Sequence, residues 1–172
     1  MFDPTVFDNL KVVLEGAVYD LDLEGLIEVK SRNDLVNLAD MSRTWSISFQ
    51  EDPAGTEAEI QLSIIADQLQ TEWKKTADYA GCSLQISFYQ WADSESGYVK
   101  PLTSIREIWG EDVSVDIELS FNPLAEKKQF KHTWTIYFDR LITEEHAGDL
   151  ESVVESVCTT LKKIDYKKGA GL

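Results

Sequence analysis

The sequence predicts an α+β fold in which a largely antiparallel sheet of about six strands carries two long helices on one face. The main observation is a Trp-bearing strand pattern that occurs twice, at Arg43–Phe49 and at Lys131–Phe138. Each copy is followed by an amphipathic segment that ends in a Lys-Lys pair. Strand-rich stretches that each end in a helix therefore suggest a tandem duplication of a βββα unit.

The spacing of the two copies supports a duplication. Thr44 and Thr133 lie 89 positions apart, and Leu62–Lys75 aligns with Leu150–Lys163 at 88 positions. A strand, a connection and a helix that recur in the same order are harder to obtain by convergence than one short match. Convergence of ordinary strand and helix segments is the alternative.

The length of 172 residues fits a single domain with one core. We expect that domain to occupy residues 1–164, as two pseudo-repeats at about 10–81 and 82–164, with 165–172 as a flexible tail. The second repeat would contain an extra stretch, roughly Asp93–Glu111.

Acidic residues dominate the composition, with 31 Asp and Glu against 16 Lys and Arg and a formal charge of −15. Such a charge repels phosphate backbones, so nucleic-acid binding is disfavoured unless the protein imitates a nucleic acid toward a basic protein. No apolar run is long enough for a membrane span and no signal peptide is evident, so a cytoplasmic protein is expected.

The first half of the chain contains alternating apolar residues that predict strands. After a short helix at Pro4–Leu10, the expected strands are Val12–Tyr19, Leu26–Lys30 and Arg43–Phe49. Thr56–Glu59 has the spacing of a capping box, and the apolar residues after it recur at intervals of three and four, which predicts a helix through Trp73. Residues 60–66 also alternate, so a strand is the alternative there.

The second half repeats the strand signals and ends in a helix. Its expected strands are Leu84–Trp91, Val113–Phe121 and Lys131–Phe138. One helical turn is expected at Ser104–Trp109. A helix capped by Thr143 should bury the stripe Leu150, Val153, Val157, Leu161 and Ile164.

Chemical signatures are few. The sequence contains no phosphate-binding loop, nucleophile elbow or zinc-protease pattern, so no catalytic residue, metal site or cofactor is assigned. His132 shares its side of a strand with Trp134, which favours a packed imidazole over a general base. Cys82 and Cys158 lie among apolar residues and are expected to be buried thiols. Asp20-Leu21-Asp22 could bind a cation but more commonly forms a turn.

The strand face opposite the predicted helices combines aromatic, hydroxyl and carboxylate side chains. Its candidate contact residues are Tyr19, Glu28, Tyr89, Trp91, Glu118 and Tyr137. We expect a non-catalytic protein-interaction module, chaperone-like or immunity-like in general constitution, with a basic protein partner. The alternatives are a cleft between the repeats that binds a cationic amphipathic molecule, and a homodimer that covers this face.

Overall fold

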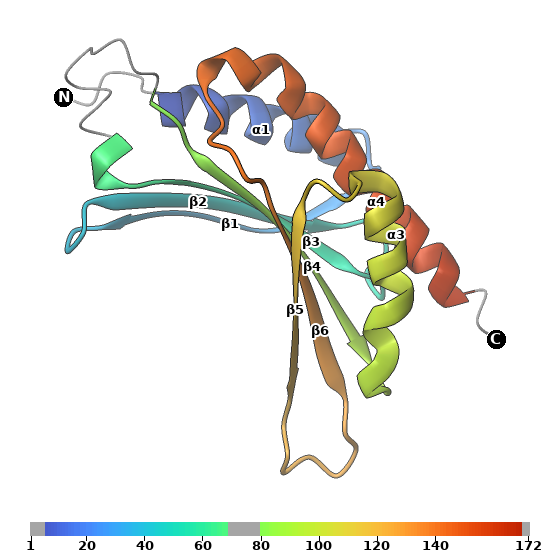
Figure 1. Ribbon diagram of the computed structural model, residues 1–172. Coiled ribbons are helices and arrows are strands. Elements are labelled where there is room, and N and C mark those ends of the chain that lie inside the picture. Colours follow the sequence, from blue (N-terminus) through green and yellow to red (C-terminus); the bar gives the residue numbers. More distant parts are fainter. Residues whose placement is uncertain (1–5, 69–79, 170–172) are drawn as a thin grey trace.

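The computed structural model describes residues 6–68 and 80–169, and it arranges six strands in one antiparallel sheet. Two long helices, α1 (Val6–Leu23) and α4 (Leu150–Gly169), lie on one side of the sheet together with the shorter α3 (Val99–Trp109) (Figure 1). None of the described helices covers the other side of the sheet. The predicted fold class is therefore confirmed. Among the described helices, none is long and apolar enough to cross a membrane.

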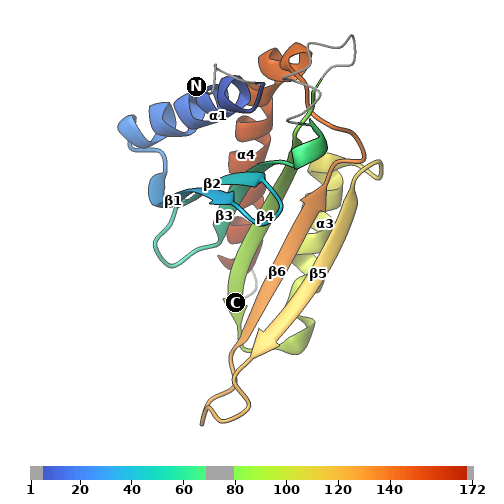
Figure 2. The ribbon, with the colours of Figure 1, turned by 90° about the vertical axis from the view of Figure 1, so that its left-hand side faces the viewer.

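The strands follow the order β1-β2-β3-β4-β6-β5 across the sheet. A hairpin forms each edge, and the two hairpins project in different directions because the sheet is strongly twisted (Figures 1 and 2). The strands are β1 (Glu28–Asn37), β2 (Ser42–Gln50), β3 (Glu57–Ile64), β4 (Ser83–Ala92), β5 (Ser114–Phe121) and β6 (Phe130–Tyr137).

The strand predicted at Val12–Tyr19 is wrong, because these residues belong to α1. The buried residues of α1 recur every three or four positions, which is the helical period, and they are Phe7, Leu10, Leu14 and Val18. The helical stripe runs through α1 from Phe7 to Val18, and it determines the structure in place of the short alternation within Val12–Tyr19. Just beyond α1, Gly25 adopts a φ of 73°, a conformation that glycine tolerates at a helix end.

The helix predicted from Thr56 is wrong over Glu57–Ile64, which form the central strand β3. Every second residue of β3 is buried, as the strand alternative for 60–66 requires. The Thr56 hydroxyl does not cap a helix but donates a 2.7 Å hydrogen bond to Asp165 of α4. Residues 66–68 are helical, and the rest of the predicted helix, from residue 69, lies outside the described residues.

The extra stretch at Asp93–Glu111 forms a layer of its own. It contains η1 (Glu95–Tyr98) and the whole of α3, where only one helical turn was predicted. The Trp134 indole of β6 donates to the Tyr98 carbonyl (3.2 Å), and the Trp109 indole of α3 donates to Thr160 of α4 (2.9 Å). The stretch therefore packs the second half of the sheet against α4.

The C-terminal helix α4 begins at Leu150, after η2 (Glu144–Asp149), so the predicted cap Thr143 starts a 3-10 helix rather than α4 itself. Residues 165–169 of the predicted tail continue α4 as helix. Asp165 accepts hydrogen bonds from both the backbone and the hydroxyl of Thr56, at 3.0 and 2.7 Å. This buried contact fixes the end of α4 to the start of β3.

The two Trp-bearing strands occupy corresponding places in the sheet. Trp45 of β2 and Trp134 of β6 are both fully buried, and each strand is the second of an edge hairpin. The segments around them do not correspond: Leu62 lies in a strand and its proposed counterpart Leu150 in a helix, while α1 replaces the first predicted strand. The duplication therefore stays a prediction.

Candidate interaction surface

The open face is the side of the sheet that no described helix covers. The strand registers bring one row of residues from all six strands side by side across it. That row is Glu28, Gln50, Glu57, Tyr89, Thr133 and Glu118. The next row along the strands, in the direction of Tyr137 on β6, is Ser31, Ser48, Glu59, Ser87, Thr135 and Asp116. The open face is therefore polar and rich in carboxylates.

Small hydroxyl side chains form the floor of the open face. Ser31 and Ser48 are linked at 2.8 Å, and Ser87 and Thr135 at 3.1 Å, across neighbouring strands. Ser48 and Ser87 are only 2% and 3% exposed because longer neighbouring side chains stand above them. These satisfied hydroxyls require neither apolar cover nor further partners, so the face is stable in contact with water.

Five of the six predicted contact residues lie on the open face. Glu28, Tyr89 and Glu118 share one row, and Trp91 and Tyr137 lie toward opposite ends of the strands. Lys131, the β6 partner of Trp91, lies six residues before Tyr137 on the same strand, a distance of about 20 Å along the strands. Glu28 and Glu118 are separated by the width of the sheet, about 24 Å. These residues cannot meet around one small molecule.

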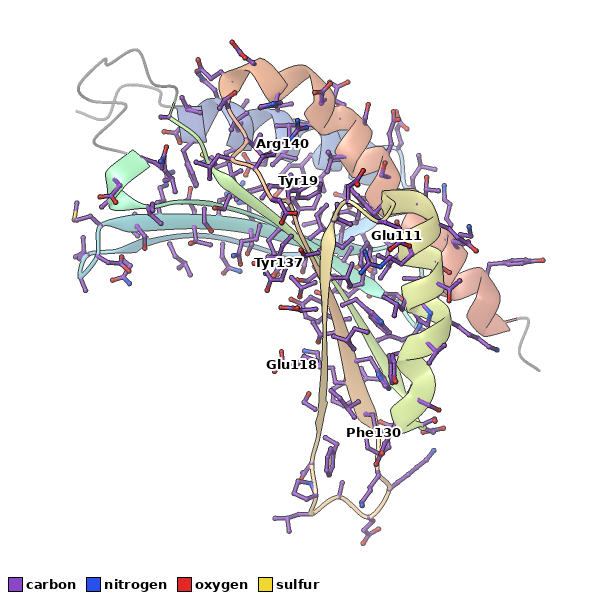
Figure 3. All side chains as sticks on the ribbon, in the orientation of Figure 1. Tyr19, Glu111, Glu118, Phe130, Tyr137 and Arg140 are labelled. Atoms are coloured by element: carbon purple, nitrogen blue, oxygen red, sulfur yellow. The ribbon has the colours of Figure 1, made fainter. Side chains whose placement is uncertain are left out.

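Tyr19 is the exception, and its assignment to the open face is wrong. It lies on α1, partly buried against the core, on the helix-bearing side of the sheet (Figure 3). Glu118 and Tyr137 point to the opposite side. The misplacement follows from the misassigned first strand.

Sequence reasoning missed the carboxylates of the central strand, Glu57 and Glu59, because β3 was predicted as a helix. The signal was present in the sequence, since Ala58, Ile60, Leu62 and Ile64 alternate with polar residues. With β3 in the sheet, the open face carries Glu28, Glu57, Glu59, Asp116 and Glu118.

Tyr89 is the best-connected side chain of the face. Its hydroxyl donates to Glu59 at 3.2 Å, and the Lys131 ammonium lies 4.7 Å from its ring centre, in a cation–π contact. Burial, and then the negative charge of Glu59, raises the pKa of Tyr89 to about 12. The phenol therefore stays protonated and acts as a hydrogen-bond donor at neutral pH.

The carboxylates on the two sides of the sheet differ in how far neighbouring cations neutralise their charge. On the helix-bearing side, Asp34 contacts Arg43 at 2.8 Å and Lys11 at 2.9 Å, and Glu15 contacts Arg32 at 2.9 Å. Arg43 and Lys11 hold the pKa of Asp34 down, at about 2.

On the open face the acidic side chains have less compensation. Glu28 contacts Lys30 at 3.6 Å, whereas Glu57, Asp116 and Glu118 form no salt bridge with any other described residue. Negative charge on this face is thus available to an external cation.

The described part of the chain offers little reactive chemistry. His132 is completely buried, stacks on Trp134 and lies 2.9 Å from the Ser94 carbonyl through Nε2, so it cannot reach a substrate in solvent. Burial raises the pKa of the Cys158 thiol to about 11. No group of metal-ligating side chains occurs among the described residues, and Asp22 accepts a hydrogen bond from the Val29 backbone instead.

Comparison with known proteins assigns no family: no protein-family model matches the chain, and no curated protein or solved structure matches it significantly. The junction between the two proposed repeats is also not an open gap, since β3 and β4 pair continuously from Glu57 to Ser63. Function must therefore be inferred from the open face itself.

Proposed function

We propose that this protein is a non-catalytic interaction module whose open face binds a basic protein partner. The observation that carries this proposal is a broad uncovered face on which the carboxylates of Glu57, Asp116 and Glu118 form no salt bridge with a described residue. A basic partner would supply the missing positive charge.

The dimensions of the face suit a protein rather than a small molecule. Six strands and about eight residues along each give roughly 650 Å², against about 800 Å² that each partner buries in a standard interface. The exposed aromatics stand at separate points of this area, with Trp91 56% and Tyr137 38% exposed. Aromatic side chains supply large contact area at low entropic cost, which is why they recur at protein interfaces.

Charge would act mainly on the rate and selectivity of binding. The net charge of −15 attracts basic proteins over distances longer than any contact and repels acidic ones. Binding should therefore weaken as salt concentration rises. A partner with Lys or Arg side chains at strand-like spacing could reach Glu57 and Glu118 together, which lie in one row of the open face.

The alternative of a small cationic ligand has weaker support. The Tyr89 ring, the best cation site among the candidates, is already occupied by Lys131 at 4.7 Å. Quenching of Trp fluorescence by small hydrophobic cations, at concentrations that leave the oligomeric state unchanged, would favour this alternative over a protein partner.

The proposal can be tested by photocrosslinking in the cells that produce the protein. A photoreactive amino acid replaces Trp91 or Tyr137 on the open face, and Tyr166, which is 78% exposed on α4, serves as the control position. We expect one basic protein to be trapped from both open-face positions and not from the control. Trapping of a second copy of this chain, or of nothing, would contradict the proposal.

A binding measurement with the purified trapped protein completes the test. The double variant W91A/Y137A should fold normally, because both side chains lie on the solvent side of the sheet, but it should bind more weakly. If the variant unfolds instead, the open face is part of the core and cannot be a docking surface.

A further inference from the structure

The edge strand β5 differs from β1, the strand at the other edge of the sheet. Both edge strands are exposed along their length except for the half-buried Val115 of β5 and Val29 of β1, but only β5 pairs with its neighbour without a register shift. Because only one side of β5 is paired, every second residue turns its N–H and C=O groups to the free side. Over eight residues this presents about 27 Å of unpaired backbone.

The other edge is protected against strand addition. The pairing of β1 with β2 is interrupted between Val29 and Ser31, which marks a β-bulge at Lys30. Arg32 and Asp34 of β1 point toward the helix-bearing side, where they bind Glu15 and Lys11 of α1. Bulges and inward-pointing charges are devices by which proteins prevent unwanted pairing at sheet edges.

β5 lacks these devices, since Ser114–Phe121 contains no Lys, Arg, Pro or bulge. Its side chains instead divide into two chemically distinct rows. Asp116 and Glu118 stand on the open face, and the opposite side presents half-exposed apolar side chains. Those are Ile117, Leu119 and Phe121, which are 39%, 40% and 45% exposed.

We infer that β5 is a docking edge for an extended segment of the partner protein in which basic and apolar residues alternate. Such a segment would pair its backbone with β5, place its Lys or Arg side chains beside Asp116 and Glu118, and cover Ile117 and Leu119 with its apolar side chains. This inference rests on the proposed interaction function and specifies the form of the partner.

The same charges select against a second copy of this chain as the occupant. If two β5 strands paired around a twofold axis, Asp116 and Glu118 of one copy would face the same carboxylates of the other. Like charges at neighbouring cross-strand positions are destabilising. An alternating basic strand turns that repulsion into attraction, so β5 favours a different, basic partner.

The test uses a blocked synthetic peptide of ten residues that alternates Lys with Val, added to the intact protein. We expect binding accompanied by slower hydrogen exchange at β5 amides. A peptide of the same sequence, N-methylated at every second residue on the pairing edge, keeps the charge but cannot add as a strand. It should fail to bind.

Two charge-matched variants locate the site. D116K/E118K reverses the β5 carboxylates and should weaken peptide binding by about tenfold or more. E151K/E155K reverses two exposed carboxylates of α4 with the same change in net charge and should weaken it less than about twofold. Equal losses in both variants, binding of the N-methylated peptide, or a β5-mediated homodimer in the absence of peptide would each overturn the inference.

The outcome separates this inference from the proposed function. Suppose that a basic protein is trapped on the open face, but that neither its binding nor that of the peptide is weakened by D116K/E118K. The docking edge at β5 is then wrong and the interaction function stands. If the peptide adds to β5 as expected while nothing is trapped at Trp91 or Tyr137, the strand edge is a docking site and the broad face is not.

Discussion

The substitution T56V tests how the start of β3 is held to α4. Thr56 is completely buried, and its hydroxyl donates to Asp165 at 2.7 Å and accepts from the Gln90 side chain at 3.0 Å. Valine has nearly the same shape, so the substitution removes hydrogen bonds without opening a cavity. What remains is a buried Gln90 amide that has lost an acceptor and a carboxylate that has lost its shortest contact.

The expected loss follows from these two bonds. A hydrogen bond to a charged group contributes about 1.5–3 kcal/mol, and a neutral one about 0.5–1.5 kcal/mol. The backbone N–H of Thr56 still donates to Asp165 at 3.0 Å, which limits the damage. We therefore expect T56V to lower the free energy of unfolding by about 2–4 kcal/mol.

Urea unfolding followed by circular dichroism and Trp fluorescence measures this difference. The control is T159V, which changes an exposed threonine of α4 and should alter the free energy of unfolding by less than about 0.5 kcal/mol. A cycle with D165A should show a coupling of more than about 0.5 kcal/mol. A T56V protein as stable as T159V would refute the proposed anchor.

Three further predictions concern acid stability, packing and thiol reactivity. Because Arg43 holds the pKa of Asp34 at about 2, that carboxylate stabilises the fold fully above pH ~4, and this effect is lost as pH falls through 2. In urea titrations D34N should cost about 1 kcal/mol at neutral pH, after allowance for solvent screening, and progressively less as pH falls toward 2 and below. G81A should destabilise by about 1–3 kcal/mol in thermal unfolding, because the added Cβ would lie 2.6 Å from the Leu141 Cβ, whereas G16A on the open side of α1 should not. Cys158, with a pKa of about 11, should resist alkylation at pH ~8 until urea unfolds the protein; rapid labelling of the native state would contradict its burial.

The sequence predicted those elements whose local pattern matched their final environment. β4, β5 and β6 each alternate with a period of two, so their positions were predicted correctly, and α4 has an apolar stripe from Leu150 to Ile164 although the helix begins later than its predicted cap at Thr143. Their side-chain faces followed directly, which placed Tyr89, Trp91 and Tyr137 on the open face.

The errors arose where one segment supports two periods. Val12–Tyr19 alternates over a short window, but its longer stripe of Leu10, Leu14 and Val18 is helical. Glu57–Ile64 satisfies both a capping box and a strand, and only its neighbours β2 and β4, which pair with it on both sides, decide in favour of the strand. Pairing with strands that are distant in the chain cannot be read from the residues of the segment alone.

The candidate surface inherited both errors. Tyr19 was included because a helix was predicted as a strand, and Glu57 and Glu59 were omitted because a strand was predicted as a helix. The neutral hydroxyl floor and the contrast between paired and unpaired carboxylates depend on cross-strand register, which no residue pattern specifies.

The position of α4 over α1 and β3 has a consequence for biosynthesis. Asn9 of α1 contacts Glu144, and Thr56 contacts Asp165, so the cover that α1 gives to the first half of the chain is completed only by segments that are made last. At about 5–20 residues per second, the ribosome needs about 4 to 17 s to pass from Ile64 to Leu150. Throughout that interval the nascent chain would expose the part of the apolar side of β3 that α4 covers in the finished protein, and a molecular chaperone at the ribosome would have its longest opportunity to bind there.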